Sequence, residues 1–299
     1  MTMTRRLAVG AALLGLACGG SGGGGVDDTS SEGATAEAGL AATGSLQAER
    51  TTLVRLWSEG TPAFGVFVPN ERERGARGPD GERLPPLYTS EGGARLADDP
   101  LLDYVFLNLE GAWDPTAVGV IAEGLRGSDK TLLVRIPPIS ADGEEAARER
   151  VAESLAAGAD GIVLPHVRSP EEARAAVSFF EDAGADVWSP RNPDGTVIAM
   201  LMIEDPGALE AAAEIADIPG YSVLACGIGS LTRALGDREA GEAGNQEVLD
   251  QAKRVGLPDM ITANADDVAR RIDEGFLGLL MSGPEADAAI EVGRAHAGR

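Results

Sequence analysis

From residue 51 onward, short runs of apolar residues alternate with longer stretches of helical pattern. The clearest run is VIAMLMIEDPG at 197–207, which is apolar as far as Ile203 and continues with two acids, Glu204 and Asp205. A segment that is apolar at every position is typical of a strand buried on both faces of a parallel sheet. Active sites form at the carboxyl ends of such strands, so Glu204 is a candidate metal ligand or acid–base group. The alternative is that Glu204 is an acid capping the helix that begins near Pro206.

Eight apolar runs predict eight strands. They are Ala63–Val68, Tyr104–Leu109, Thr131–Ile136, Gly161–Pro165, Val197–Ile203, Ser222–Ala225, Met260–Ala263 and Phe276–Met281. The predicted helices are Pro115–Arg126, Gly143–Ala157, Pro170–Ala183, Ala208–Ala216, Gln246–Val255, Asp266–Glu274 and Pro284–His296. Strands and helices that alternate over about 250 residues predict one α/β domain, a (β/α)₈ TIM barrel. A doubly wound open sheet is the second fold considered, and eight units without a Gly-rich first turn favour it less.

The first connection between a strand and a helix differs from the others. Pro69–Arg83 is a polar insertion rich in Arg, Gly and Pro, and no clear helix follows it. This composition predicts either a surface loop or a lid over the mouth of the barrel.

Composition narrows the classes of partner. The chain of 299 residues carries a formal net charge of −23 and only 4% aromatic residues, so we expect an aliphatic core. Nucleic-acid binding is disfavoured because it needs clustered Lys and Arg to displace counterions from phosphates. The same acidity argues against an electrostatic attraction to anionic lipid.

The first 50 residues do not look like part of the fold. Residues 1–18 comprise a charged start, an apolar stretch at Leu7–Ala17 and then Cys18, which resembles the signal peptide of a bacterial lipoprotein. Cleavage after Ala17 by an ordinary signal peptidase is the alternative. The Gly/Ala/Ser-rich segment 19–50 is predicted to be a flexible tether, and 51–299 the folded domain. We therefore expect an exported protein on the periplasmic side, anchored to the membrane only through lipid on Cys18. If Cys18 carries lipid, Cys226 has no cysteine to pair with, and we expect it to be a small core residue.

Candidate chemistry gathers where the predicted strands end. Asn108 and Glu110 fall on the same side of the second strand, because side chains alternate along a strand. Arg135, on the next strand, could pair with Glu110 or hold a substrate carboxylate. His166 follows the fourth strand, and the other histidine of the chain is His296. His166 is therefore the one histidine that could act as a base at these strand ends. A purely structural role is the alternative.

The order of these motifs resembles the HpcH/HpaI aldolase/citrate lyase family. The matching segments are Asn108–Glu110, Val134–Pro138 (VRIPP), Leu155–Pro165 (LAAGADGIVLP), Met202–Asp205 and Gly227–Gly236 (GIGSLTRALG). They cover about 61–282, nearly the whole predicted domain. The resemblance implies a barrel that acts on pyruvate-like 2-keto acids or on acyl-CoA substrates, and members that tend to be homo-oligomers.

The resemblance also implies roles for particular residues. Arg135 takes the place of the Arg that stabilises the enolate. Glu204 takes the place of the first metal-ligand carboxylate, and Asp205 is the second predicted metal ligand. Glu110 matches the acid of the family's D-x-E motif. Gly227 and Ser230 fall in the segment expected to bind the substrate. A divalent ion, Mg²⁺ or Mn²⁺, is the implied cofactor, since both prefer oxygen ligands.

Two departures from the family pattern keep a second hypothesis open. Ser230 stands where the family has its second metal-ligand Asp, and Gly111 stands where the aldolase branch has His. The first hypothesis is a carbon–carbon lyase acting on a small 2-keto acid, with Arg135, Glu110 and His166 as catalytic residues. The second is a non-catalytic exported barrel that binds a small carboxylate or a protein partner.

Overall fold

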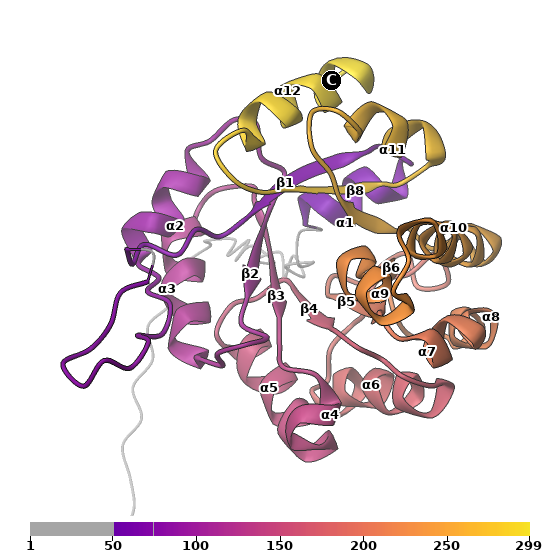
Figure 1. Ribbon diagram of the computed structural model, residues 1–299, viewed down its shortest axis with the longest axis horizontal. Helices are drawn as coiled ribbons and strands as arrows, with labels where there is room; N and C mark the ends of the chain where they lie inside the picture. The colour runs from indigo at the N-terminus through magenta and orange to yellow at the C-terminus, as the bar shows by residue number, and fades with distance from the viewer. Residues whose placement is uncertain (1–50, 74) are drawn as a thin grey trace, which may run out of the picture. The chain divides into compact units, whose positions relative to one another are not determined.

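The protein is described by a computed structural model, which covers residues 51–73 and 75–299. The predicted signal peptide, Cys18 and the predicted tether lie outside the described residues. Within the described part, eight parallel strands curl into a nearly closed barrel that is surrounded by helices (Figure 1). The predicted α/β TIM-barrel fold is confirmed.

The strands lie within two residues of their predicted positions. They are β1 Ala63–Phe67, β2 Tyr104–Asn108, β3 Thr131–Arg135, β4 Gly161–Leu164, β5 Ile198–Ile203, β6 Val223–Cys226, β7 Met260–Thr262 and β8 Gly278–Met281. Their order in the sheet is β6-β5-β4-β3-β2-β1-β8-β7, so consecutive strands are neighbours, as in a (β/α)₈ barrel. Within the described chain, β6 and β7 are the two ends of this sheet and are not hydrogen-bonded to each other. A seam therefore runs between them.

Alternation along the strands divides the core into two layers. Met200 packs inside the barrel, whereas its neighbour Leu201 packs outward against the helices. The inner layer includes Tyr104, Phe106 and Leu133, and the outer layer is mostly aliphatic. Continuous apolar runs in the sequence arise because both faces of each strand are buried.

Helices cover the outside of the barrel. They are α1 Thr52–Ser58, α2 Ser90–Ala97, α3 Pro115–Leu125, α4 Ile139–Asp142, α5 Glu144–Ala156, α6 Pro170–Asp182, α7 Pro206–Glu210, α8 Ala212–Asp217, α9 Ile228–Leu235, α10 Arg238–Val255, α11 Val268–Glu274 and α12 Ala286–His296. In the described chain, none of them is both long and apolar enough to cross a membrane.

One helix, α1, precedes the barrel and was not predicted. Its Leu53, Val54 and Trp57 join the inner layer of the core. The Leu53 N–H donates to Thr131 Oγ1 at 3.2 Å, and Trp57 Nε1 donates to the carbonyl oxygen of Leu277 at 2.9 Å. Because these partners stand at the starts of β3 and β8, α1 closes the amino-terminal end of the barrel and leaves the other end for the site.

Several helix predictions need correction. The helix predicted at 208–216 is two short ones, α7 and α8, with Ala211 between them outside both. The helix predicted from Gln246 begins eight residues earlier, at Arg238. The insertion at 69–83 is followed by the unpredicted helix α2. The insertion extends outward past α2 and α3 and does not cross the barrel (Figure 1), as expected for a surface loop and not for a lid.

Candidate active site

Four predicted site residues meet at the carboxyl end of the barrel. Arg135 is the last residue of β3, Glu204 follows β5 directly, and Glu110 and His166 each lie two residues beyond the ends of β2 and β4. Because β2, β3, β4 and β5 are neighbouring parallel strands, their ends bring these side chains to one place. These four side chains therefore converge, as expected for residues at the carboxyl ends of neighbouring parallel strands.

The four side chains form one network of opposite charges. Arg135 Nη2 lies 2.9 Å from Glu110 Oε2 and 3.2 Å from Glu204 Oε2. His166 Nε2 lies 3.3 Å from Glu110 Oε1 and 3.7 Å from Glu204 Oε2. Each carboxylate thus faces both Arg135 and His166, and each of these two residues faces both carboxylates. Such mutual pairing is what permits charges to be buried in a barrel.

Glu204 is the most deeply buried member of this network, with a side chain only 1% exposed. Arg135 Nη2 donates to both of its oxygens, and the His166 backbone N–H donates to Oε2 at 3.0 Å. Gly227 supplies the space that the carboxylate occupies: a Cβ on this residue would lie only 2.0 Å from Glu204 Oε1. The sequence predicts Gly227 as a substrate-binding residue, which stays a prediction; the structure shows that the absence of a side chain on Gly227 leaves room for Glu204.

His166 adopts an unusual backbone conformation. Its φ is +52°, and it is the one residue other than glycine with positive φ in the described chain. A side chain at positive φ is strained, and such strain is often found at functional sites. Here the conformation lets one residue contact Glu204 with both its backbone N–H and its ring.

The network shifts the pKa values of two members. The hydrogen bond with Glu110 is the main cause that raises the pKa of His166 above its ordinary value, against the effect of burial. Burial alone would raise the pKa of Glu110, but the hydrogen bond with His166 and the charge of Arg135 outweigh it and lower the pKa. At neutral pH Glu110 is therefore a carboxylate, and His166 holds its proton more firmly than a free histidine.

The other predicted residues lie around the network. Asp205 is 40% exposed and points to the other ring nitrogen of His166, with Oδ2 at 3.6 Å from Nδ1. Ser230 lines the same pocket as Arg135 and Glu204, but it makes no hydrogen bond with either in the described chain. Asp205 is thus placed to orient His166, and Ser230 lies in the wall of the pocket.

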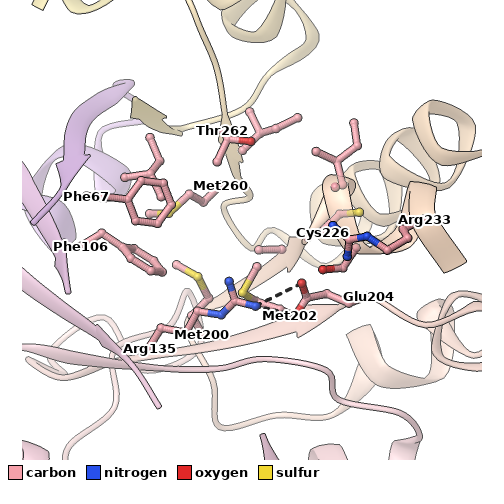
Figure 2. A pocket seen from close by; sticks show the side chains of 17 residues that line it. Phe67, Phe106, Arg135, Met200, Met202, Glu204, Cys226, Arg233, Met260 and Thr262 are labelled. Carbon is pink, nitrogen blue, oxygen red and sulfur yellow. Dashed lines mark hydrogen bonds and ion pairs between the residues drawn. The ribbon is translucent and has the colours of Figure 1, made fainter. Parts of the chain in front are cut away.

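A cavity of about 230 Å³ opens beside the network, and we call it the mouth pocket (Figure 2). Its lining includes Phe67, Phe106, Arg135, Met200, Met202, Glu204, Cys226, Gly227, Ser230, Arg233, Met260, Thr262 and Leu280. Neither its apolar wall nor Arg233 was predicted from the sequence. The wall consists of inward-facing residues of strands that read simply as apolar, while Arg233 lies within the GIGSLTRALG segment.

The donor set is compatible with a divalent cation. A carboxylate oxygen of Glu110, one of Glu204 and a ring nitrogen of His166 all lie within 4.8 Å of one another. Atoms at these separations can share one ion at roughly 2.0–2.4 Å from each. The predicted second carboxylate, Asp205, is not in this group. The cation would compete with Arg135, which already contacts both carboxylates.

Comparison with known proteins agrees with this geometry. The family model for HpcH/HpaI aldolase/citrate lyase matches residues 103–277, more than half of the chain. The chain belongs to the HpcH/HpaI aldolase/citrate lyase family. The match extends from just before β2 to just before β8, so it includes Glu110, Arg135, His166 and Glu204. No curated protein sequence matches the chain.

Solved structures share the fold of this family member. An HpcH/HpaI aldolase from Desulfitobacterium hafniense is 21% identical, with a TM-score of 0.58 over 81% of this chain and 93% of that one. A family protein from Burkholderia cenocepacia is 19% identical, with a TM-score of 0.60 over 82% and 97%. The citrate lyase β subunit from Mycobacterium tuberculosis, complexed with oxaloacetate and magnesium, is 17% identical, with a TM-score of 0.55 over 79% and 97%.

Proposed function

We propose that the protein is a carbon–carbon lyase that acts on a small 2-keto acid. The observation that carries this proposal is the Glu110–Arg135–His166–Glu204 network, because it places two carboxylates, a guanidinium and an imidazole around one edge of the mouth pocket. The pocket volume of about 230 Å³ is below the roughly 300–1,000 Å³ typical of drug-sized ligands, which favours a small substrate. Family membership and the oxaloacetate complex of the related citrate lyase subunit support the substrate class.

Of the three potential donors, Glu204 and Glu110 would hold the divalent cation, Mg²⁺ or Mn²⁺, through their carboxylate oxygens, and His166 would be left for proton transfer. When bound, such an ion polarises a keto oxygen and stabilises the negative charge that develops there. Gly227 keeps Glu204 in position, because the smallest residue is needed beside its carboxylate.

Arg135 would bind and orient the acid. Its contacts to Glu110 and Glu204 use Nη2, while its Nε is buried and has no hydrogen-bond partner within the described chain. A buried donor without a partner is unfavourable, so an acceptor from a ligand would be stabilising there. A fixed positive charge at this point also favours negative charge that develops on the substrate.

His166 would transfer the proton at C3 of the substrate. Its Nε2 lies at the network beside Glu110, while Asp205 faces Nδ1 from the outside. Glu110 and Asp205 together fix the orientation of the ring. The pKa of His166 is raised mainly by its hydrogen bond with Glu110, and an imidazole is the side chain that most readily gives and takes a proton near neutral pH.

The test measures metal binding and proton exchange separately. Calorimetry with Mn²⁺ gives the first, and exchange of the C3 protons of pyruvate in D₂O, followed by NMR, gives the second. We expect Glu204→Gln and Glu110→Gln to lose Mn²⁺ binding, and His166→Asn to bind Mn²⁺ but lose exchange. Asp205→Asn should retain Mn²⁺ binding, in contrast to a site that uses Asp205 as a ligand.

A second candidate is a non-catalytic barrel that binds a carboxylate. Ser230, which replaces an acid of the family pattern, favours it, as does the engagement of Arg135 with two carboxylates. Binding of pyruvate by the wild type without C3 exchange, in Mg²⁺ and in Mn²⁺, would select this candidate and exclude the lyase.

We also propose that the protein is exported and anchored through lipid on Cys18. The support is the apolar stretch that precedes Cys18 in the sequence. Membrane fractionation of the wild type and of Cys18→Ala tests it: unchanged partitioning of the variant would exclude the anchor.

A further inference from the structure

The charged residues of the mouth pocket lie on one side of it. Arg135, Glu204 and Arg233 are the charged residues of the lining within the described chain. Figure 2 shows Arg233 beside Glu204, and the guanidinium of Arg135 reaches toward the same carboxylate. Away from them, Figure 2 shows the two phenylalanine rings of the lining with Met260 next to them. A ligand held at the network therefore has an uncharged surface beside its other end.

This uncharged surface is the apolar wall, and its side chains point into the barrel. They are Phe67, Phe106, Met200, Met202, Met260 and Leu280, which belong to the inner layer of the core or pack against it. Phe106, Met200 and Met260 are each no more than 5% exposed. Phe67 and Phe106 form an edge-to-face pair with ring centroids 5.2 Å apart. Rings and thioethers offer an apolar ligand many dispersion contacts.

The same wall is unfavourable for a polar ligand group. Phenylalanine, methionine and leucine side chains have no hydrogen-bond donor. A hydroxyl or carboxylate placed against them would lose its hydrogen bonds to water without replacing them. Such a loss lowers affinity by roughly 5- to 150-fold. The wall therefore selects by burial of apolar surface, whereas the network selects by charge.

The size of the pocket sets the size of the apolar group. A cavity of about 150 Å³ lined by Leu, Ile and Phe holds a benzene molecule. The mouth pocket measures about 230 Å³, so a group of that size fits and leaves space next to the network. We infer that the substrate is a 2-keto acid whose substituent beyond the keto group is apolar, up to the size of a ring. This inference rests on the proposed function and names the substrate class of that same site.

The experiment measures how affinity changes as the apolar substituent grows. Pyruvate, 2-oxobutyrate, 2-oxopentanoate and 4-methyl-2-oxopentanoate form a series of increasing apolar size, and phenylpyruvate carries a ring. 2-Oxoglutarate is the polar counterpart of 2-oxopentanoate, because a carboxylate replaces the terminal methyl group. Affinities of the full chain for each acid are measured by calorimetry in Mn²⁺.

We expect the affinity of the wild type to rise roughly fourfold with each added methylene, as for the transfer of one CH₂ group out of water. 2-Oxopentanoate should bind roughly tenfold or more tightly than 2-oxoglutarate, because the distal carboxylate would be desolvated at the wall. An affinity that stays level or falls along the series would overturn the inference, as would tighter binding of 2-oxoglutarate.

Two variants test whether the apolar wall causes this gain. Met260→Gln keeps the length of the side chain and adds an amide, so the gain per methylene should shrink. Phe67→Ala removes one ring of the wall, so the larger acids should lose more affinity than pyruvate does. Tyr88→Ala is the matched control, because Tyr88 is also a half-buried aromatic residue and lies outside the pocket lining. The Mn²⁺ affinity of each variant reports whether the network is intact. An unchanged gain in both wall variants would overturn the role of the wall.

Failure of this inference and failure of the proposed function have different signatures. C3 exchange of pyruvate by the wild type, with no gain in affinity along the series, would refute the apolar substituent alone. A gain along the series without C3 exchange would support the apolar wall and refute the lyase. Absence of both exchange and binding of every acid would refute the two proposals together.

Discussion

Replacing Gly227 by alanine should damage the site through a single contact. Gly227 has φ −78° and ψ 73°, so its backbone does not require glycine. The added Cβ, however, would lie 2.0 Å from Oε1, 2.4 Å from Cδ and 2.5 Å from Cγ of Glu204. Non-bonded carbon atoms normally approach no closer than about 3.5 Å, so the Glu204 side chain must move. We therefore expect loss of the proposed metal-binding geometry together with loss of stability.

The magnitude follows from what Glu204 would lose. Its carboxylate accepts hydrogen bonds from Arg135 and from the His166 backbone N–H, and its side chain is 1% exposed. Hydrogen bonds to charged groups contribute about 1.5–3 kcal/mol each, so the loss of both destabilises by about 3–6 kcal/mol. That is a large fraction of the roughly 5–15 kcal/mol by which domains are stable.

A double-mutant cycle isolates this contact. The free energy of unfolding is measured in urea for the wild type, Gly227→Ala, Glu204→Ala and the double variant. In the Glu204→Ala background the added Cβ no longer meets a carboxylate, so Gly227→Ala should cost less there by 2 kcal/mol or more, roughly the coupling of contacting residues. Gly229→Ala is the control, since its Cβ would meet nothing within 4 Å. An equal cost of Gly227→Ala in both backgrounds would refute the reasoning.

Three further predictions follow from burial and pairing. His166→Asn tests the raised pKa of His166. The pairing of protonated His166 with Glu110 stabilises the fold fully below the unfolded pKa of about 6.5, and this stabilisation is lost as pH rises through the folded pKa. The difference in the free energy of unfolding between the wild type and the variant, measured in urea, should therefore shrink with rising pH. Asparagine tolerates the positive φ at this position. Arg135→Ala leaves Glu204 buried without its cation, so we expect a loss of about 3–5 kcal/mol by urea unfolding, and a neutral Glu204→Gln in the same chain should recover part of it. Burial raises the pKa of the Cys226 thiol, so in a Cys18→Ser chain a thiol reagent should react only after denaturant is added; rapid reaction of the folded protein would contradict this.

The strands were predictable because burial on both faces leaves a continuous apolar run, and each run ended within two residues of its strand. Helix α10 shows why some helices were not. Its first turns, which include Gly241 and Gly244, lack an apolar period, and glycine disfavours a helix. The same glycines permit close packing: a Cβ on Gly241 would lie 2.0 Å from Thr232 Oγ1, and one on Gly244 would lie 2.9 Å from Leu209. Tertiary packing thus overrides local propensity here.

The part of the site that stands at the strand ends was predictable once the strands were. Neighbouring parallel strands of a barrel all end at the same face. Once the strand ends are placed, this alone brings Glu110, Arg135 and Glu204 together. The fit of Gly227 against Glu204 and the position of Arg233 depend on the path of the chain after β6. The spacing of hydrophobic residues in the sequence does not predict that path.

The seam between β6 and β7 explains why the mouth pocket lies where it does. Ala225 and Cys226 of β6 and Met260 and Thr262 of β7 line the cavity from the two unpaired edges. Side chains of the closed half, β2 to β5, meet closely enough to form the charged network, whereas the open half leaves space. The two halves would then serve different parts of the proposed function: the network would perform the chemistry, while the seam side would contact the rest of the substrate. Thr262→Val should therefore change which acid binds while Mn²⁺ affinity stays the same, whereas Glu204→Gln should lose Mn²⁺ affinity.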